Sequence, residues 1–387
     1  MHEDDGQIRR MCSDAGARGK HRDGRETEGA GHGALLLEVQ PPSDRSQAQG
    51  FRTNAQTVRN KVNDTVHTLE DDVVIPGLPN SLDIITGPAT NTRRNAWPPA
   101  NGDTQTPPSE RERALDSTDV ARHWEANAEA WTRQARSGFD IFRDAVNTPA
   151  FMAQLPAIQG REGLDVGCGE GSNTRQLARR GAKMMAVDIA PTFVRHAQET
   201  ECKDPLGIEF RVGDGMALPF VEESFDFVTA FMSLMDMPDP QRALREANRV
   251  LRSGGFLQFS ILHPCFVPPH RKVLRRRNGK TRAIEIGDYF ATTTGRVDTW
   301  WFSMLSRKQR QKVAPFQTPI FHRTLSQWID LVVGAGFAIE KLGEPTAGTA
   351  PGRREAVLED TEVAPLSLIV LATKRRAVSG PSPAPTP

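Results

Sequence analysis

A regular alternation of short apolar runs with amphipathic stretches, between residues 163 and 262, constrains the fold more than any other feature of the chain. The apolar runs are typical of buried strands and occupy residues 163–166, 183–187, 208–212, 225–231 and 256–262. Helical patterns lie between them, at residues 173–180, 191–200 and 240–251. Strand, helix and strand at this cadence predict right-handed crossovers and a mostly parallel α/β sheet.

The composition predicts that only part of the chain is packed into a core. Residues 1–115 are rich in Gly, Asp, Arg, Ser, Asn, Pro and Thr, and the whole chain is only 37% hydrophobic. Such a segment cannot bury enough apolar surface to offset the entropy of ordering it, so we expect it to be largely disordered. A regulatory or partner-binding arm is the alternative. The Pro-rich residues 376–387 are expected to be a disordered tail.

The ordered domain is expected to span residues 116–375, with a cofactor-binding core at 163–262 and a substrate-side insert at 263–325. The strand–helix rhythm stops after residue 262, and residues 263–316 are expected to be irregular. Beyond the insert, the pattern predicts one helix and then two strands that pair like a hairpin, at residues 326–333, 337–342 and 366–373.

A capped helix is expected at the start of the domain. Asp116, Ser117 and Thr118 are all good helix-cap residues. Trp124 and Trp131 follow at helical spacing and should share one face. We expect these two side chains to belong to the core or to a lid; direct contact with a cofactor is the alternative.

Charge, cysteine spacing and hydropathy disfavour several classes of protein. The formal net charge of +1 gives no bulk electrostatic argument for nucleic acid or membrane binding. The four cysteines form no CxxC or Cys/His metal spacing, so we expect neither a metal site nor a disulfide framework. No apolar run reaches transmembrane length, and the N-terminal residues lack the order of a signal or transit peptide. A cytoplasmic location is therefore expected.

The strongest local signal is an apolar strand that runs into a glycine turn and the start of a helix, Leu164-Asp165-Val166-Gly167-Cys168-Gly169-Glu170-Gly171. Glycines let the backbone bend sharply and approach a ligand closely, and a helix N-terminus offers N–H groups. Asp188 ends the next predicted strand, 19 residues after Gly169. That spacing suits a carboxylate that accepts hydrogen bonds from both hydroxyls of a ribose.

Two details separate this loop from one that binds a nicotinamide dinucleotide. The glycines are spaced GxGxG rather than GxGxxG, and the carboxylate of Asp165 would repel a pyrophosphate. An amino group and a sulfonium would instead be attracted by a carboxylate, so the charges indicate S-adenosylmethionine. After the third strand, Asp214 could accept a hydrogen bond from the adenine amino group, with Met216 beside the ring.

The segment from Leu164 to Leu262 resembles the class I S-adenosylmethionine-dependent methyltransferases, in the methyltransferase type 11-like branch that includes ubiquinone- and menaquinone-biosynthesis enzymes. The resemblance implies a Rossmann-like sheet of seven strands, with helices on both faces and an antiparallel last strand. It also implies that Phe231 and Met232 line the methionine end of the cofactor. The long insert departs from the family pattern, so no acceptor is carried over from any one relative.

The motifs and the resemblance together define one set of expected cofactor-binding residues. These are Asp165, Gly167, Cys168, Gly169, Gly171, Asp188, Ile189, Asp214, Gly215, Met216, Phe231 and Met232. Within this set, Cys168 is expected to pack as a small side chain rather than to act as a nucleophile, because methyl transfer from a sulfonium needs no covalent enzyme intermediate.

The expected reaction is a direct displacement, in which an O, N, C or S atom of a small-molecule acceptor attacks the sulfonium methyl in line. A general base is needed only if the acceptor loses a proton as it attacks. His263 is the candidate, because it follows the carboxyl end of a central strand, where open α/β sheets place ligands. The alternative is a histidine that satisfies the turn beside Pro264.

The insert leaves further possibilities open. Its aromatic side chains could cap a planar acceptor or pack the insert onto the domain; they are Tyr289, Phe290, Trp300, Trp301 and Phe302. The basic run at residues 270–280 could be a solvated loop, or could hold an anionic substrate or RNA. The alternative functions are thus an RNA or protein methyltransferase and a non-catalytic scaffold that binds the cofactor. A nicotinamide dehydrogenase is disfavoured by the glycine spacing.

Overall fold

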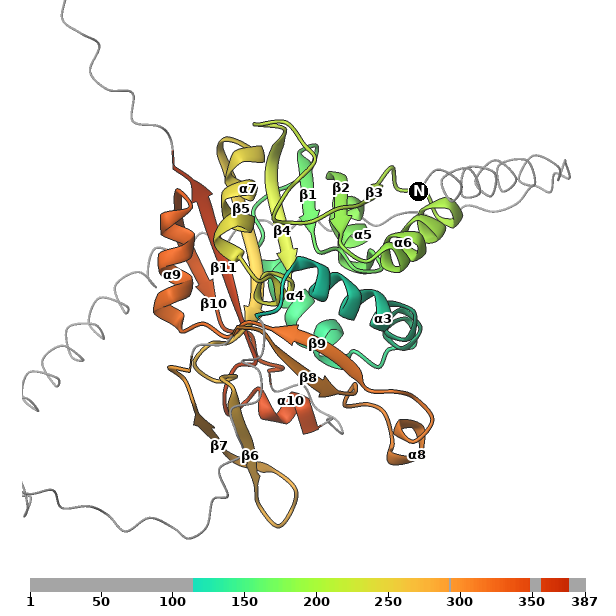
Figure 1. The fold of residues 1–387 in the computed structure, drawn as a ribbon, viewed down its shortest axis with the longest axis vertical. Coiled ribbons are helices and arrows are strands. Elements are labelled where there is room, and N and C mark those ends of the chain that lie inside the picture. The colour runs from blue at the N-terminus through green and yellow to red at the C-terminus, as the bar shows by residue number, and fades with distance from the viewer. Residues whose placement is uncertain (1–113, 292–293, 349–355, 376–387) are drawn as a thin grey trace, which may run out of the picture. The chain divides into compact units, whose positions relative to one another are not determined.

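The computed structural model describes residues 114–291, 294–348 and 356–375. The predictions of disorder for residues 1–115 and 376–387 lie almost entirely outside the described residues. Within the described ranges the chain forms one sheet of seven strands flanked by helices, and two small hairpins (Figure 1).

The seven strands of the sheet lie in the spatial order β10-β11-β5-β4-β1-β2-β3. Along the chain they are β1 (Glu162–Val166), β2 (Lys183–Asp188), β3 (Glu209–Val212), β4 (Phe225–Phe231), β5 (Leu251–Leu262), β10 (Phe337–Gly343) and β11 (Ser367–Lys374). Strands β1 to β5 pair in parallel, whereas β11 is antiparallel to both of its neighbours, β5 and β10. The predicted Rossmann-like sheet with an antiparallel last strand is therefore confirmed.

Helices cover both faces of the sheet, because successive strand residues point to opposite sides. In β4, Val228 belongs to one apolar core and Phe227 to the other. The first core is covered by α7 (Pro240–Val250) and α9 (Leu325–Gly334). The second is covered by α4 (Thr148–Gln154), α5 (Ser172–Arg179) and α6 (Pro191–Lys203). The two helix layers hold the strands in place, and with them the strand ends at which the predicted site residues lie.

The first described helix, α3 (Ser117–Arg136), starts where the cap residues predict. The Asp116 carboxylate accepts hydrogen bonds from the backbone N–H groups of Thr118 and Asp119 at 2.9 and 3.0 Å. The π-helical turn η1 (Arg143–Asn147) then leads directly into α4. π-helical turns are rare in proteins, and those that occur are often found at functional sites.

The insert is not irregular, so that prediction is wrong. It forms two antiparallel hairpins, β6–β7 (His270–Arg275 and Thr281–Gly287) and β8–β9 (Arg296–Trp300 and Phe316–Ile320), with the short helix α8 (Arg307–Arg310). An isolated hairpin is marginally stable, so its neighbours decide whether it forms.

Aromatic packing joins the second hairpin to α3. The ring of Trp131 lies 5.5, 5.0 and 4.9 Å from those of Trp300, Phe302 and Phe316, measured between centroids. Trp131 also meets Trp124 edge-on, at 5.4 Å. Of the two roles considered for the insert aromatics, Trp300 and Phe302 therefore take the packing role, and the two helix tryptophans belong to the core as expected.

Candidate functional site

The predicted site residues converge at one edge of the sheet. The parallel strands β1, β2, β4 and β5 end there (Figure 1). Asp188 is the last residue of β2, and Gly167, Met232 and His263 each follow directly after β1, β4 and β5. Ligands of open α/β sheets bind outside these carboxyl ends. Segments that are far apart in the sequence are thus brought together as the motifs predict.

The glycine loop after β1 needs glycine at two points for different reasons. Gly167 has a φ of +74°, and a Cβ there would lie 2.4 Å from the Cβ of Ser233. Gly169 has a φ of +56°, but a Cβ there would meet no atom within 4 Å. The backbone therefore bends tightly at Gly167, whereas a side chain at Gly169 would be disfavoured by its positive φ and not by a lack of space.

The N–H groups of this loop are mostly used within the protein. Those of Gly167 and Cys168 donate to the carbonyl of Val187 at 2.8 and 3.1 Å. The N–H of Gly169 donates to the Oδ2 atom of Asp188 at 2.8 Å. The loop is thus no open cradle of N–H groups of the kind that binds a pyrophosphate, which argues against a dinucleotide.

Asp188, the carboxylate predicted to accept from a ribose, is almost fully buried. Only 8% of the residue is exposed, and its second oxygen accepts from the N–H of Ala190 at 2.9 Å. Burial raises its pKa to about 6, against the hydrogen bonds from Ala190 and Gly169, which lower it. Asp188 is therefore ionised at neutral pH, and its oxygens keep lone pairs for two further donors.

Asp165 is fully buried and already has two partners. Its oxygens accept from the hydroxyls of Thr174 and Thr229 at 2.5 and 2.8 Å, which ties β1 to α5 and β4. Burial raises the pKa of Asp165 to about 6. Both oxygens of Asp165 are therefore already hydrogen-bonded within the protein, so the predicted direct contact with the cofactor would have to compete with these hydroxyls. The carboxylate also fixes the position of the loop after β1.

The loop after β3 lies against the end of β2. The N–H of Gly213 donates to the carbonyl of Asp188 at 2.9 Å, and Asp214 accepts from the N–H of Met216 at 2.8 Å. A Cβ on Gly215 would lie 2.7 Å from Val166, so this loop packs closely on β1. Met216 is 5% exposed and lies in the hydrophobic core rather than open beside a ring, whereas Asp214 is half-buried.

At the end of β4, Phe231 is tightly packed and the next residue, Met232, has a strained backbone. Phe231 stacks on Phe151 of α4, with ring centroids 3.8 Å apart. Met232 has a φ of +53°, in the left-handed region, and its N–H donates to the carbonyl of Ser260 at 3.0 Å. A non-glycine residue in this region costs energy and is frequent at functional sites. Met232 therefore remains a candidate for contact with a ligand.

The remaining predicted cofactor residues support the turns. Gly171 caps α5 in the left-handed conformation, and Ile189 is half-buried just after Asp188. Burial strongly raises the pKa of the Cys168 thiol, which disfavours the reactive thiolate form. This agrees with the expectation that Cys168 packs and is not a nucleophile.

His263 already has partners for both ring nitrogens. Nε2 lies 2.9 Å from Oε1 of Glu344, and Nδ1 accepts from the N–H of Cys265 at 3.2 Å. The residue is only 2% exposed. This geometry favours the alternative role, a histidine that satisfies the turn, over that of a proton acceptor.

The sequence motifs did not predict the contribution of α3 and η1, which form one wall of the candidate site. From α3, Glu125 accepts from the N–H of Thr192 at 3.0 Å, at the start of α6. From η1, Arg143 pairs with Glu170 of the glycine loop at 3.1 Å, and Arg136 lies 3.5 Å from the same carboxylate. The helices before β1 therefore clamp both the loop after β1 and the turn after β2.

Thr132 lies within this wall. It stands four residues after Ala128, which packs with Ala190 just beyond β2, and four residues before Arg136, which pairs with the glycine loop. Residues four apart share a helix face. Thr132 is 2% exposed, and in the described part of the chain its hydroxyl has no hydrogen-bond partner. A buried hydroxyl without a partner on this helix face is a candidate to bind a ligand.

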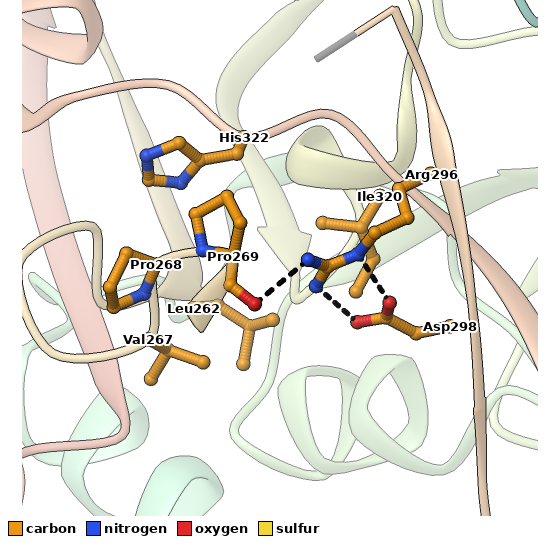
Figure 2. A pocket seen from close by; sticks show the side chains of 8 residues that line it. All are labelled: Leu262, Val267, Pro268, Pro269, Arg296, Asp298, Ile320 and His322. Carbon is orange, nitrogen blue, oxygen red and sulfur yellow. Dashed lines mark hydrogen bonds and ion pairs between the residues drawn. The ribbon is translucent and has the colours of Figure 1, made fainter. Parts of the chain in front are cut away.

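A second hollow lies between the end of β5 and the insert (Figure 2). It is a small cavity of about 30 Å³, and it is lined by Leu262, Val267, Pro268, Pro269, Arg296, Asp298, Ile320 and His322. Arg296 forms two hydrogen bonds with Asp298, at 2.6 and 2.8 Å, and a third to the carbonyl of Pro269 at 2.9 Å. The walls are otherwise mainly apolar.

The other insert aromatics do not line this hollow either. The Tyr289 hydroxyl accepts from the N–H of Leu325 at 2.9 Å, and Trp301 donates to the carbonyl of Val313 at 3.3 Å. Phe290 is 86% exposed. None of these three side chains lines the hollow.

Membrane spans, metal-binding groups and cysteines were also considered in the described residues. No helix in the described ranges is long and apolar enough to cross a membrane. Nor do the described His, Cys, Asp and Glu residues form a group that could hold a metal ion. Cys168 and Cys265 carry free thiols.

The central segment of the chain is similar to known proteins. Residues 164–259 match the family model described as a methyltransferase domain. The demethylmenaquinone methyltransferase of Tropheryma whipplei is 36% identical over 138 residues, which are 35% of this chain and 57% of that protein. The ubiquinone biosynthesis O-methyltransferase of Xanthomonas campestris is 34% identical over 114 residues, 29% of this chain and 48% of that protein. The chain thus spans about half the length of these curated relatives.

One of the solved structures that match the chain is a methyltransferase. The S-adenosylmethionine dependent methyltransferase from Mesorhizobium loti aligns with a TM-score of 0.47 at 24% sequence identity. The alignment covers 58% of this chain and 96% of that one.

Proposed function

We propose that the protein transfers a methyl group from S-adenosylmethionine to a small-molecule acceptor, because residues 164–259 match the family model described as a methyltransferase domain. The observation that carries the proposal is the Asp188 carboxylate, held by the N–H groups of Gly169 and Ala190 beside the glycine loop. The relatives, a demethylmenaquinone methyltransferase and a ubiquinone biosynthesis O-methyltransferase, support a small-molecule acceptor.

In this proposal the chain's own residues bind and orient the cofactor, which when bound supplies an activated methyl group. Asp188 accepts from the ribose hydroxyls, and Asp214 is the acceptor for the adenine amino group. The Thr132 hydroxyl gains a partner, and the negative charge of Asp165 favours a sulfonium or an ammonium nearby. Alignment of the reacting atoms then accounts for most of the rate.

Exclusion of water is the second task of the protein. The aromatic cluster of Trp131, Trp300, Phe302 and Phe316 fastens the insert to α3. Since α3 is also anchored to the glycine loop through Arg136, the insert and the cofactor loop are joined by one rigid helix. A dry enclosure strengthens every charge interaction within it. We expect loosening of this cluster to weaken turnover as well as stability.

Labelled methyl transfer tests the proposal. The protein is incubated with S-adenosylmethionine labelled in its methyl group and with a small-molecule cell extract, and label in the extract compounds is counted. Wild type should transfer label and Asp188→Ala should not. Asp226→Ala is the matched control, because Asp226 pairs with Arg252 at the opposite end of β4. Transfer by Asp188→Ala at the wild-type rate would refute the role given to this carboxylate.

The charge of the insert favours one second candidate, an RNA methyltransferase. Residues 263–325 contain thirteen Lys and Arg residues but only three Asp and Glu residues, although the whole chain has a net charge of only +1. Two clusters of exposed cations lie at the tip of β6–β7 and on α8: Arg276, Arg277, Lys280, Arg307, Lys308 and Arg310. Such clusters are suited to phosphate contacts.

Salt dependence separates the two candidates. A labelled single-stranded RNA of mixed sequence is titrated with the protein at several salt concentrations between about 50 and 200 mM, the range over which phosphate contacts weaken steeply. Tight binding with a steep salt slope, lost when the cations of both tips are replaced by Gln, would support the RNA acceptor. Binding that is absent throughout leaves the small-molecule proposal in place.

A further inference from the structure

Asn147 is a buried amide that the predicted motifs do not include. It is the last residue of the π-helical turn η1 and is only 1% exposed. Its Nδ2 atom donates to the hydroxyl of Ser260 at 3.1 Å, and its Oδ1 atom accepts from the hydroxyl of Ser367 at 3.0 Å. Both serines are fully buried. Buried polar groups that are paired in this way fix one another, so Asn147 joins η1 to the strands β5 and β11.

The hydrogen bonds continue from Ser260 to Met232. The N–H of Met232 donates to both oxygens of Ser260, to the carbonyl at 3.0 Å and to the hydroxyl at 3.2 Å. Met232, just after β4, is the residue with a φ of +53°. A non-glycine residue keeps such a conformation only where its surroundings hold it there. The bonds to Ser260 hold Met232, and Asn147 in turn fixes the Ser260 hydroxyl.

The turn that contains Met232 packs directly on the glycine loop. The next residue, Ser233, donates from its hydroxyl to the carbonyl of Val166, the last residue of β1, at 2.8 Å. Its Cβ would also lie 2.4 Å from a Cβ placed on Gly167. The backbone position of Met232 is therefore coupled to that of the loop after β1.

The π-helical turn η1 reaches both loops. At its first residue, Arg143 pairs with Glu170 of the glycine loop at 3.1 Å. At its last residue, Asn147 bonds to Ser260 beside the end of β4. One turn of five residues is therefore bound to the glycine loop at its start and, through Ser260, to Met232 at its end.

The order of the strands relates this region to one part of the proposed cofactor. The strands β3, β2, β1 and β4 are neighbours in that order. In the proposed function, Asp214 after β3 accepts from the adenine, and Asp188 at the end of β2 accepts from the ribose. A ligand that continues in the same direction passes the loop after β1 and reaches the turn after β4. Met232 thus lies on the side of the amino-acid part of the cofactor, away from the adenosine part.

We infer that Asn147 is a positioning residue for the amino-acid part of S-adenosylmethionine, and that it acts through Ser260 by holding the Met232 backbone. This inference rests on the proposed methyltransferase function. Without Asn147, the Ser260 hydroxyl loses a partner, and Met232 can relax to the commoner conformations with negative φ. Binding of the amino-acid part then has to restore the strained conformation, which weakens the affinity.

Two ligands that differ in the amino-acid part test the inference. S-adenosylhomocysteine and methylthioadenosine share the adenosine and the thioether sulfur, but in the second a methyl group replaces the amino-acid chain. Both are titrated calorimetrically into wild type and Asn147→Ala. S-adenosylhomocysteine should bind the variant about 10-fold more weakly, because a strained backbone has to be re-formed. Methylthioadenosine should bind both proteins equally. Equal weakening of both ligands, or unchanged affinity for S-adenosylhomocysteine, would overturn the inference.

Gln258→Ala is the matched control for the loss of a buried amide. The Gln258 Nε2 atom donates to the carbonyl of Phe151 at 2.7 Å, so this side chain joins β5 to α4. It lies two residues before Ser260 on the same strand, further from the carboxyl edge. The thermal midpoint should fall in both variants, whereas the affinity for S-adenosylhomocysteine should fall only in Asn147→Ala. The same loss of affinity in Gln258→Ala would contradict a specific role for Asn147.

Ser260→Ala decides the question if Asn147→Ala does not fold. It removes the hydroxyl that both Asn147 and Met232 contact, so it should weaken S-adenosylhomocysteine about 10-fold and leave methylthioadenosine unchanged. In the double variant the two effects should not add, since both act on the same hydroxyl. If folded wild type binds neither ligand, the proposed function fails. If wild type binds both and Ser260→Ala has the same two affinities, only this inference fails.

Discussion

The backbone N–H of Gly169 donates to Oδ2 of Asp188 at 2.8 Å, and this bond joins the loop after β1 to the end of β2. The other carboxylate oxygen accepts from Ala190, which starts the turn into α6. A single buried carboxylate thus holds both the loop after β1 and the turn after β2. The protonation state of Asp188 should therefore affect the affinity for the cofactor.

Cofactor affinity should depend on pH through Asp188. Burial raises the pKa of this carboxyl to about 6, so it is mostly protonated at pH 5 and mostly ionised at pH 7. The protonated form loses acceptor capacity for the ribose hydroxyls. Affinity for S-adenosylhomocysteine should therefore rise from pH 5 to pH 7 and then level off. Calorimetry on wild type and Asp188→Asn checks this; a wild-type profile as flat as that of the variant would contradict it.

Asp165 should lower the stability of the protein as pH rises from about 4 to 6. Its pKa is raised from 3.8 to about 6, so in this window the folded state binds more protons than the unfolded one. Unfolding then becomes easier with rising pH. Asp165→Asn, which can still bond to Thr174 and Thr229, should gain stability relative to wild type between pH 4 and 7, by up to about 3 kcal/mol.

Urea unfolding at pH 4 and pH 7 measures this effect. Asp226→Asn is a control of opposite sign, because the hydrogen bonds from Glu162 and Arg252 lower the pKa of Asp226 despite some desolvation. Asp226 contributes stability that is present above its unfolded pKa and is lost as pH falls. The same pH trend in both variants would show that the environments assigned to the two acids are wrong.

The Thr132 hydroxyl should cost stability in the free protein and favour the bound state. Thr132→Val keeps the shape and removes a buried group without a partner, so the free protein should become about 1 kcal/mol more stable. Loss of one hydrogen bond to the cofactor should weaken binding about five-fold. Thr118→Val, on the exposed start of the same helix, is the matched control. Stronger or unchanged cofactor binding by Thr132→Val would exclude the hydroxyl from the site.

His263 should prove to be a structural residue. His263→Ala loses the hydrogen bonds to Glu344 and Cys265 and leaves a cavity, so we expect a loss of about 2 kcal/mol in the free energy of unfolding. Turnover per folded molecule should stay near the wild-type value. His270→Ala, at a half-exposed position in the insert, should change neither quantity. A large drop in turnover with unchanged stability would restore His263 as the general base.

The core of the fold was predictable because its signals are local. Strands at residues 163–166 and 183–187 are short apolar runs, and the structure extends them by only one residue each, at Glu162 and at Asp188. The glycines and Asp188 were predictable for the same reason, since turn geometry and strand ends impose residue types directly. The cap at Asp116 is another local signal that the structure bears out.

The insert and the rest of the site depend on contacts between distant segments. The hairpin β8–β9 is held by Trp131, which lies far away in the sequence, so no periodicity within the insert predicts it. The role proposed for Thr132 follows from a missing hydrogen-bond partner, which only a packed structure can show. His263 sits at the predicted strand end, but Glu344 and Cys265 occupy its nitrogens.

Calorimetric titration of S-adenosylmethionine and S-adenosylhomocysteine into wild type and Asp188→Ala tests the central claim most directly. We predict micromolar binding to wild type, lost in the variant while circular dichroism shows both proteins folded. Absence of binding to folded wild type would contradict the assignment of this edge of the sheet as a cofactor site, and with it the proposed methyl transfer.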